Sequence, residues 1–79
     1  MLDQDPMAPP PRALESARQL SARQLEVLEM VSRGLTNHEI ATLLHLSVHA
    51  VKFHLASIYE KLGVSNRTEA AVTYLRASA

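Results

Sequence analysis

The chain has 79 residues, no cysteine, and equal numbers of basic and acidic side chains, so its formal net charge is zero. That length allows one small domain, and the absence of thiols excludes both disulfide bonds and a thiolate zinc site. Aliphatic residues are abundant, glycine is scarce, and no stretch is apolar and long enough to cross a membrane. This composition is typical of a small bundle of helices.

Residues 1–19 are predicted to form a flexible, proline-rich linker or tail in front of a single domain over residues 20–79. The pair Asp5-Pro6 and the run Pro9-Pro10-Pro11 disfavour helix and favour an extended polyproline geometry. The segment is acidic, unlike the basic start of a signal peptide, so we expect a cytoplasmic protein. Both a tail without a role and a linker to an upstream domain fit this composition.

Three helix starts share one pattern, in which a leucine precedes a hydroxyl residue that serves as the N-cap. A serine or threonine at this position accepts hydrogen bonds from the free N–H groups of the first helical turn. Gln24 and Glu39 occupy the third helical position that completes a capping box, and an aliphatic residue follows each cap at hydrophobic-staple spacing. The three starts are Leu20-Ser21, Leu35-Thr36 and Leu46-Ser47.

The hydrophobic periodicity predicts four helices, over about residues 22–33, 37–44, 48–62 and 67–77, and no strand. Gly34 and Gly63 are predicted to end the first and third helices, and Asn66 and Glu69 to cap the fourth. The residues predicted to face the core are Leu25, Val27, Leu28 and Val31 in the first helix, Ile40, Leu43 and Leu44 in the second, Val51, Leu55, Ile58 and Leu62 in the third, and Ala70, Ala71, Tyr74 and Leu75 in the fourth.

The second and third helix starts lie eleven residues apart, which leaves room for a short helix, a tight turn and a new helix. This outline predicts a helix-turn-helix within an all-α four-helix bundle, and it points to double-stranded DNA as the partner. Between residues 47 and 67 the three cations Lys52, Lys61 and Arg67 face one acid, Glu60, which leaves a local charge of three minus one, or +2. So small an excess of positive charge predicts that a monomer binds DNA weakly.

The third helix is predicted to present one side to DNA. With Val51 at the centre of its buried side and steps of about 100° per residue, His49, Phe53 and Ala56 fall on the opposite side. Early residues of a recognition helix enter the major groove, where Lys52 can donate to guanine and Phe53 can contact a thymine methyl group. His49 belongs to the same base-facing set. The residues expected to contact the phosphate backbone are Thr36, Asn37, Ser47 and His54.

Metal binding and catalysis are not expected. Four histidines occur, but no cysteine or spare inward carboxylate joins them at ligand spacing. The hydroxyl residues at the helix starts serve as caps, and no nucleophile motif surrounds them. We therefore expect no cofactor, no metal and no enzymatic activity.

From Leu20 to Leu75 the chain resembles the DNA-binding domain of LuxR/NarL-type (GerE-type) bacterial transcription regulators. Four segments carry the resemblance, in matching order and spacing: residues 20–28 (LSARQLEVL), residues 34–41 (GLTNHEIA), Leu46-Ser47 with residues 51–54 (VKFH), and residues 61–70 (KLGVSNRTEA). The resemblance implies a four-helix fold in which the second and third helices make the helix-turn-helix.

The resemblance also implies roles for individual residues. Lys52, Phe53 and Ala56 match base-facing positions of the family, whereas Lys61 and Arg67 match positions near the DNA backbone, as do Thr36, Ser47 and His54. The fourth helix matches the family's dimer contact, and its helical phase predicts a homodimer seam of Glu69, Val72, Thr73 and Arg76. Such domains usually follow a receiver or small-ligand sensor domain, so the resemblance implies the output domain of a response regulator in a two-component system, with RNA polymerase as a further possible partner.

Two alternatives remain open at this point. One is a promoter-binding module like region 4 of a sigma factor, although such a module is expected to carry more arginines on the third helix and no fourth helix opened by residues 66–69. The other is a helical adaptor that binds protein and has no affinity for DNA, which the zero net charge and the outward Phe53 favour. Titration with mixed-sequence DNA at low salt distinguishes a DNA-binding domain from the adaptor, because an adaptor would show no perturbation of Lys52, His54 or Lys61.

Overall fold

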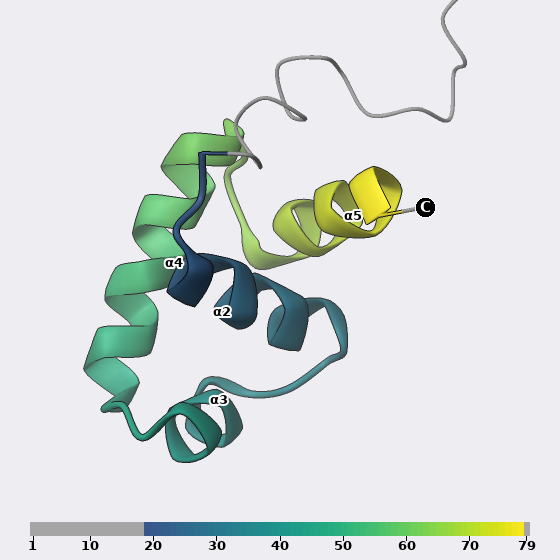
Figure 1. Cartoon of the computed structure of the whole chain (residues 1–79). Helices are drawn as coiled ribbons and strands as arrows, with labels where there is room; N and C mark the ends of the chain where they lie inside the picture. The colour runs from purple at the N-terminus through teal and green to yellow at the C-terminus, as the bar shows by residue number, and fades with distance from the viewer. Residues whose placement is uncertain (1–18, 79) are drawn as a thin grey trace, which may run out of the picture.

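The computed structural model describes residues 19–78, which form four helices (Figure 1). Helix α2 spans Ala22–Ser32, α3 spans Asn37–Leu44, α4 spans Val48–Leu62 and α5 spans Arg67–Ser78. These bounds confirm the predicted all-α fold with a helix-turn-helix, formed by α3 and α4. The predicted linker, apart from residue 19, lies outside the described residues. Across residues 19–78 no helix is both long enough and apolar enough to cross a membrane.

The predicted caps begin the helices. The hydroxyl oxygens of Ser21, Thr36 and Ser47 each accept a hydrogen bond from the backbone N–H three residues later, at 3.0 to 3.1 Å. Capping boxes are complete at the first two caps, because the side chains of Gln24 and Glu39 accept from the backbone N–H groups of their own N-caps. Local sequence alone therefore fixes where α2, α3 and α4 begin.

Helix α5 begins with a variation on this pattern. The side chain of Asn66 accepts from the N–H of Glu69, as the sequence predicted. The Glu69 carboxylate accepts from the N–H of Ser65, one residue before the cap. Both bonds hold the turn that follows Gly63, so they set the direction in which α5 leaves α4.

Three helices end in the same way, with a residue in the left-handed conformation. After α2, Gly34 has φ +88°, and the N–H of Leu35 donates to the carbonyl of Met30. Gly63 repeats the arrangement after α4, where Val64 donates to the carbonyl of Tyr59. These are Schellman motifs, which satisfy carbonyls that a helix end leaves free.

The turn between α3 and α4 uses a histidine for the same purpose. His45 has φ 57° and is the one non-glycine residue with positive φ in the part of the chain described here. The N–H of Leu46 closes the motif on the carbonyl of Ala41 at 2.8 Å. Ser47 caps α4 two residues later, so the two helices are joined by three residues and α4 leaves α3 in a single direction (Figure 1).

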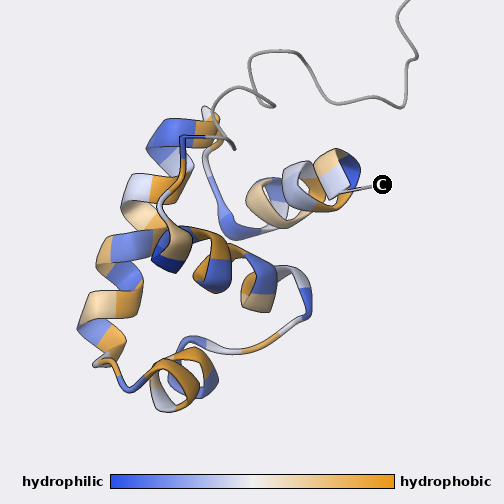
Figure 2. Cartoon of the chain, viewed as in Figure 1, coloured by the Kyte–Doolittle hydropathy of each residue, from blue (hydrophilic) through white to orange (hydrophobic). Residues whose placement is uncertain are grey.

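The core lies where α2, α4 and α5 meet, and α3 covers the N-terminal part of α4 (Figure 1). Helix α2 contacts both α4 and α5, while α3 packs mainly on α4. Hydrophobic residues alternate with hydrophilic ones along α4, as expected for a helix with one buried side (Figure 2). The largest fully buried side chains are Val27, Leu28, Ile40, Val51 and Ile58.

Three leucines predicted to face the core are exposed instead. Leu43 is 59% exposed because α3 packs mainly on α4, and its other sides face away from the bundle. Leu75 is 54% exposed near the end of α5, where Ala70 is the buried residue, and Leu25 is 39% exposed on α2. The predicted buried side of α4 is correct at all four positions.

Candidate nucleic-acid interface

One side of α4 is open along its whole length. Val51, Leu55, Ile58 and Leu62 face inward, whereas His49, Phe53, Ala56 and Glu60 are exposed on the opposite side, where the helical phase places them. We call these four exposed residues the open face. Phe53 is 74% exposed, the largest value among the exposed large hydrophobic residues of the described chain. Phe53, Ala56, Ser57 and Glu60 line a hollow of about 370 Å³ on this side.

A second hollow lies along one flank of the open face, next to Lys52. Its volume is about 650 Å³, and it brings together residues from three separate parts of the chain. Four of the residues predicted to contact DNA line it: Thr36, Asn37, Lys52 and Arg67. The fold thus gathers the N-terminus of α3, a lysine of α4 and an arginine of α5 around one concave surface.

Arg67 ties two of these elements together. Its Nη1 donates to Oδ1 of Asn37 at 2.7 Å, and its Nη2 donates to the carbonyl oxygen of Leu35. Both side chains are half-buried. The sequence predicted separate phosphate contacts for Asn37 and Arg67, and their bond to each other adds a structural role that local sequence signals did not reveal.

The other flank of the open face carries a second polar network. Ser57 and Lys61 lie one turn apart on α4, and both contact the buried Gln24 of α2. The Gln24 amide nitrogen donates to Ser57 Oγ at 3.1 Å, and Lys61 Nζ donates to Gln24 Oε1 at 2.9 Å. Sequence reasoning recognised Gln24 only as a cap. Its position one turn before Val27 and Leu28 on the buried stripe of α2 was the signal for its second role.

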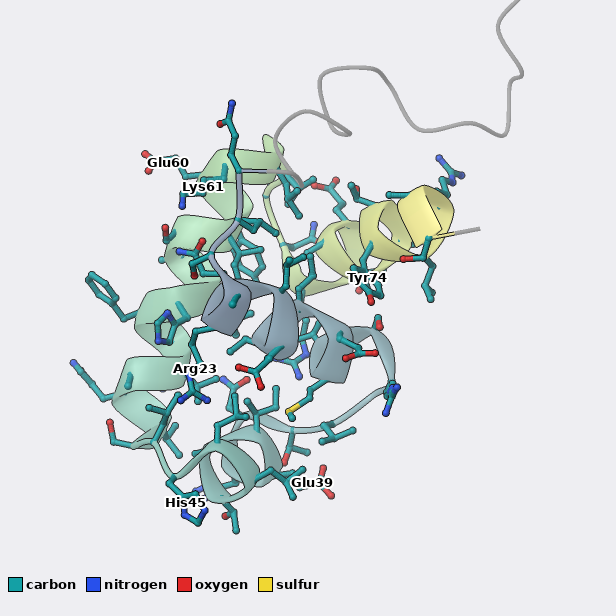
Figure 3. The ribbon with its side chains drawn as sticks, in the orientation of Figure 1. Arg23, Glu39, His45, Glu60, Lys61 and Tyr74 are labelled. Carbon is teal, nitrogen blue, oxygen red and sulfur yellow. The ribbon has the colours of Figure 1, made fainter. Side chains whose placement is uncertain are left out.

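The two lysines flank the open face from opposite sides. They are nine residues apart on α4, which corresponds to half a turn in phase and about 13.5 Å along the helix axis at ~1.5 Å per residue. The major groove is about 12 Å wide, with a phosphate backbone on each side. Lys61 and Glu60 lie near the end of α4 that is remote from His45 and the α3–α4 turn (Figure 3).

Charge is distributed unevenly over the helices. Within residues 19–78 the ion pairs are Arg23 with Glu26 at 3.7 Å and Arg33 with Glu29 at 3.0 Å, both on or next to α2. Lys52, Lys61 and Arg67 have no carboxylate partner within this part of the chain. Within residues 19–78, three of the cations without an ion pair therefore lie on α4 and at the start of α5, and the fourth, Arg76, lies near the end of α5.

The remaining predicted backbone contacts keep a free donor or are partly accessible. Thr36 and Ser47 use their hydroxyl oxygens as cap acceptors, which leaves each O–H free to donate outward. His54 is half-buried on α4. No group of three or more His, Cys, Asp or Glu residues that could hold a metal ion occurs within residues 19–78.

The predicted dimer seam lies on α5. Glu69, Val72 and Arg76 are exposed and Thr73 is half-buried, whereas Tyr74 packs against the core. Leu75 was predicted to be buried, but it is exposed about 60° from Val72 in helical phase. The two apolar side chains therefore share one exposed side of the helix, although sequence reasoning placed only Val72 there.

Comparison with known proteins agrees with this geometry. Residues 18–74 match the family of bacterial regulatory proteins described as the luxR family. The chain belongs to the luxR family. The members of this family are DNA-binding transcription regulators, and the match covers all of α2, α3 and α4 and most of α5.

Individual relatives support the same assignment. YhjB of Escherichia coli (strain K12), named as an HTH-type transcriptional regulator, is 44% identical over 63 residues, which is 80% of this chain and 32% of YhjB. The transcriptional regulatory protein ComA of Bacillus subtilis (strain 168) is 38% identical over 72 residues, which is 91% of this chain and 34% of ComA. The response regulator protein VraR of Staphylococcus aureus (strain Mu3 / ATCC 700698) is 38% identical over 53 residues, 67% of this chain and 25% of VraR.

These similarities cover only part of each relative. The chain spans a quarter to a third of the length of these curated relatives. The luxR match favours a regulator domain over the alternative of a sigma-factor module, since it includes α5, which the sigma-factor alternative was not expected to have.

Proposed function

We propose that this chain reads the sequence of double-stranded DNA by placing the open face of α4 in the major groove. The observation that carries the proposal is the exposure of Phe53 on the side of α4 opposite its buried stripe. An aromatic ring so exposed is unfavourable in water and suits contact with apolar base edges such as the thymine methyl group. Lys52, His49 and Ala56 are the other proposed base-facing residues.

The phosphate contacts are proposed on both flanks of this face. Thr36, Asn37 and Arg67 line the hollow beside Lys52. His54 lies within about 20° of Lys61 in helical phase, so these two belong to the opposite flank. Ser47 caps the start of α4. The positive end of each helix dipole, at the starts of α3 and α4, favours phosphate as well. Each phosphate neutralised by a cation contributes about −0.9 to the slope of the logarithm of the binding constant against the logarithm of the salt concentration. Three cations therefore predict a slope of about −2.7 per domain.

We further propose that the chain acts as a homodimer and as the output domain of a response regulator. The exposed pair Val72 and Leu75 on α5 supports a two-fold contact, in which the same surface of each copy meets its equivalent. Two domains would bind half-sites about one helical turn apart, with a combined slope of about −5.4. The similarity of part of VraR, a response regulator, supports control by an upstream receiver or sensor domain. RNA polymerase is a further proposed partner.

Selection of binding sites from a randomised duplex pool tests the proposal. The selected duplex and a scrambled duplex of equal composition are then titrated by fluorescence anisotropy over a range of salt concentrations. The proposal expects the selected duplex to bind more tightly and both affinities to fall with salt. If no sequence is enriched and the randomised pool does not bind at low salt, the proposal is wrong, and the alternative of a protein-binding adaptor is favoured.

A further inference from the structure

We propose that Gln24 is a positioning residue that aims the ammonium group of Lys61 at the DNA backbone while leaving its charge uncompensated. This inference rests on the proposed function and deepens it, because it explains how the flank of α4 remote from Lys52 is prepared for phosphate. It begins with a buried polar side chain that makes more contacts than a helix cap needs.

Both the oxygen and the nitrogen of the Gln24 amide make hydrogen bonds. Its oxygen accepts from the backbone N–H of Ser21 at 3.0 Å, which completes the cap of α2, and also from Lys61 Nζ at 2.9 Å. Its nitrogen donates to Ser57 Oγ at 3.1 Å. The buried amide cannot move without breaking the hydrogen bond that caps α2. Its oxygen atom therefore accepts from the Lys61 ammonium group at a fixed position.

Holding a lysine in place matters because its free side chain is flexible. The ammonium group has three N–H donors, and Gln24 uses one of them, so two remain for a phosphate oxygen. Ordering a long side chain before DNA arrives lowers the entropy lost on binding. Lys61 is half-buried, so its aliphatic stem is restrained along with its head group.

The neutrality of Gln24 is the decisive point. A glutamate at this position could accept from both Ser21 and Lys61 in the same way, and the Ser57 hydroxyl could turn to donate to it. The carboxylate would then pair with the ammonium group, and a lysine already neutralised inside the protein releases little counterion from DNA. The amide keeps the geometry and leaves the charge available.

The Gln24→Glu substitution tests this. Thermal unfolding is measured first, and the variant is expected to fold with a melting temperature equal to or above that of the unmodified chain. Its DNA affinity should be lower and its salt slope shallower by about 0.9 per domain, so its affinity deficit should shrink about 3.5-fold between about 50 and 200 mM salt. In a Lys61→Ala background, Gln24→Glu should produce no further change in slope.

Ala22→Glu is the matched control, because it adds the same charge to the first turn of α2 at an exposed residue that makes no hydrogen bond to Lys61. It should leave the salt slope unchanged. Lys61→Gln is the second variant, since it retains an amide donor toward Gln24 but removes the charge, and its slope should also fall by about 0.9.

The possible failures are distinguishable. If Gln24→Glu and the unmodified chain share one slope, or if Ala22→Glu shifts the slope equally, the role of Gln24 is wrong while the DNA-binding function stands. If Lys61→Gln leaves the slope unchanged, Lys61 does not contact phosphate and the inference fails even if Gln24→Glu does not fold. If the unmodified chain binds no duplex, the proposed function fails first, and this inference fails with it.

Discussion

Arg67, the first residue of α5, donates a hydrogen bond across 2.7 Å to Asn37, the first residue of α3. The same guanidinium also donates to the carbonyl of Leu35 in the turn that precedes α3. One side chain therefore joins the beginnings of two helices that lie thirty residues apart in the sequence. It links the start of α3, the first helix of the helix-turn-helix, to the start of the helix proposed to make the dimer contact.

Arg67→Ala should therefore destabilise the domain by about 1–3 kcal/mol, the range expected when partners of a charged hydrogen bond are left unsatisfied. Chemical denaturation measures the free energy of unfolding. Arg23→Ala is the control, because the exposed ion pair of Arg23 with Glu26 should contribute less than about 1 kcal/mol. Equal losses in the two variants would show that the link between α3 and α5 contributes little to stability.

Phe53→Ala should leave the stability of the fold almost unchanged while weakening binding to the selected duplex. The ring is 74% exposed, so removing it opens no cavity. If it contacts a thymine methyl group, replacing that thymine by deoxyuridine should weaken the unmodified chain and leave Phe53→Ala unaffected. Leu55→Ala, which truncates a buried residue two positions later, should instead cost about 2–5 kcal/mol of stability. Additive effects of Phe53→Ala and deoxyuridine at every thymine would contradict the proposed contact.

Lys52 and Lys61 should differ in how their loss depends on DNA sequence. Lys52→Ala should cost about 1–3 kcal/mol on the selected duplex if the amine contacts a base, and much less on a scrambled one. Lys61→Ala should weaken both duplexes by about the same factor, since a phosphate contact carries no sequence information. Anisotropy titrations of both variants on both duplexes measure these losses. A uniform loss for Lys52→Ala, or a sequence-selective loss for Lys61→Ala, would reverse the two assignments.

His45→Gly should stabilise the turn of the helix-turn-helix by up to about 1 kcal/mol. Histidine at φ 57° occupies a region that is unfavourable for side chains with a Cβ atom, whereas glycine enters it without this penalty. His49→Gly, in the first turn of α4, should have the opposite effect, a loss of about 1 kcal/mol, because glycine is a poor helix former. Thermal and chemical unfolding of both variants measure the difference, and a loss of stability in His45→Gly would show that the imidazole itself supports the turn.

Val72→Glu should abolish self-association through α5. A carboxylate on each copy would be buried against its equivalent at the two-fold contact, where it has no partner of opposite charge. Leu43→Glu makes the same chemical change on the exposed side of α3 and should leave association unchanged. Sedimentation analysis over a range of concentrations measures both. If only Leu43→Glu dissociates the dimer, α3 and not α5 forms the contact.

The sequence predicted the beginnings of the helices well because these depend on neighbouring residues. Ser21, Thr36 and Ser47 cap within their own first turns, and the bounds of α3 and α4 match the prediction. Periodicity predicted the buried side of α4, which packs against three other helices. It was wrong for Leu25, Leu43 and Leu75, because an apolar stripe does not reveal how many neighbours cover a helix.

The polar contacts between helices could not be predicted from the sequence, for a related reason. Gln24 meets Lys61 and Arg67 meets Asn37 across 37 and 30 residues of chain, and no local pattern encodes such a pairing. Two residues expected to act independently on phosphate are therefore bonded to each other. The proposed base-facing set could be predicted because it follows from the phase of a single helix.

The most direct test of the account is a residue-by-residue NMR titration of the chain with its selected duplex. The account predicts that the largest perturbations fall on Lys52, Phe53 and Ala56, with smaller ones at Thr36 and Lys61 on the two flanks. Perturbations confined to the exposed side of α3 around Leu43, with the open face of α4 unchanged at saturating DNA, would contradict it.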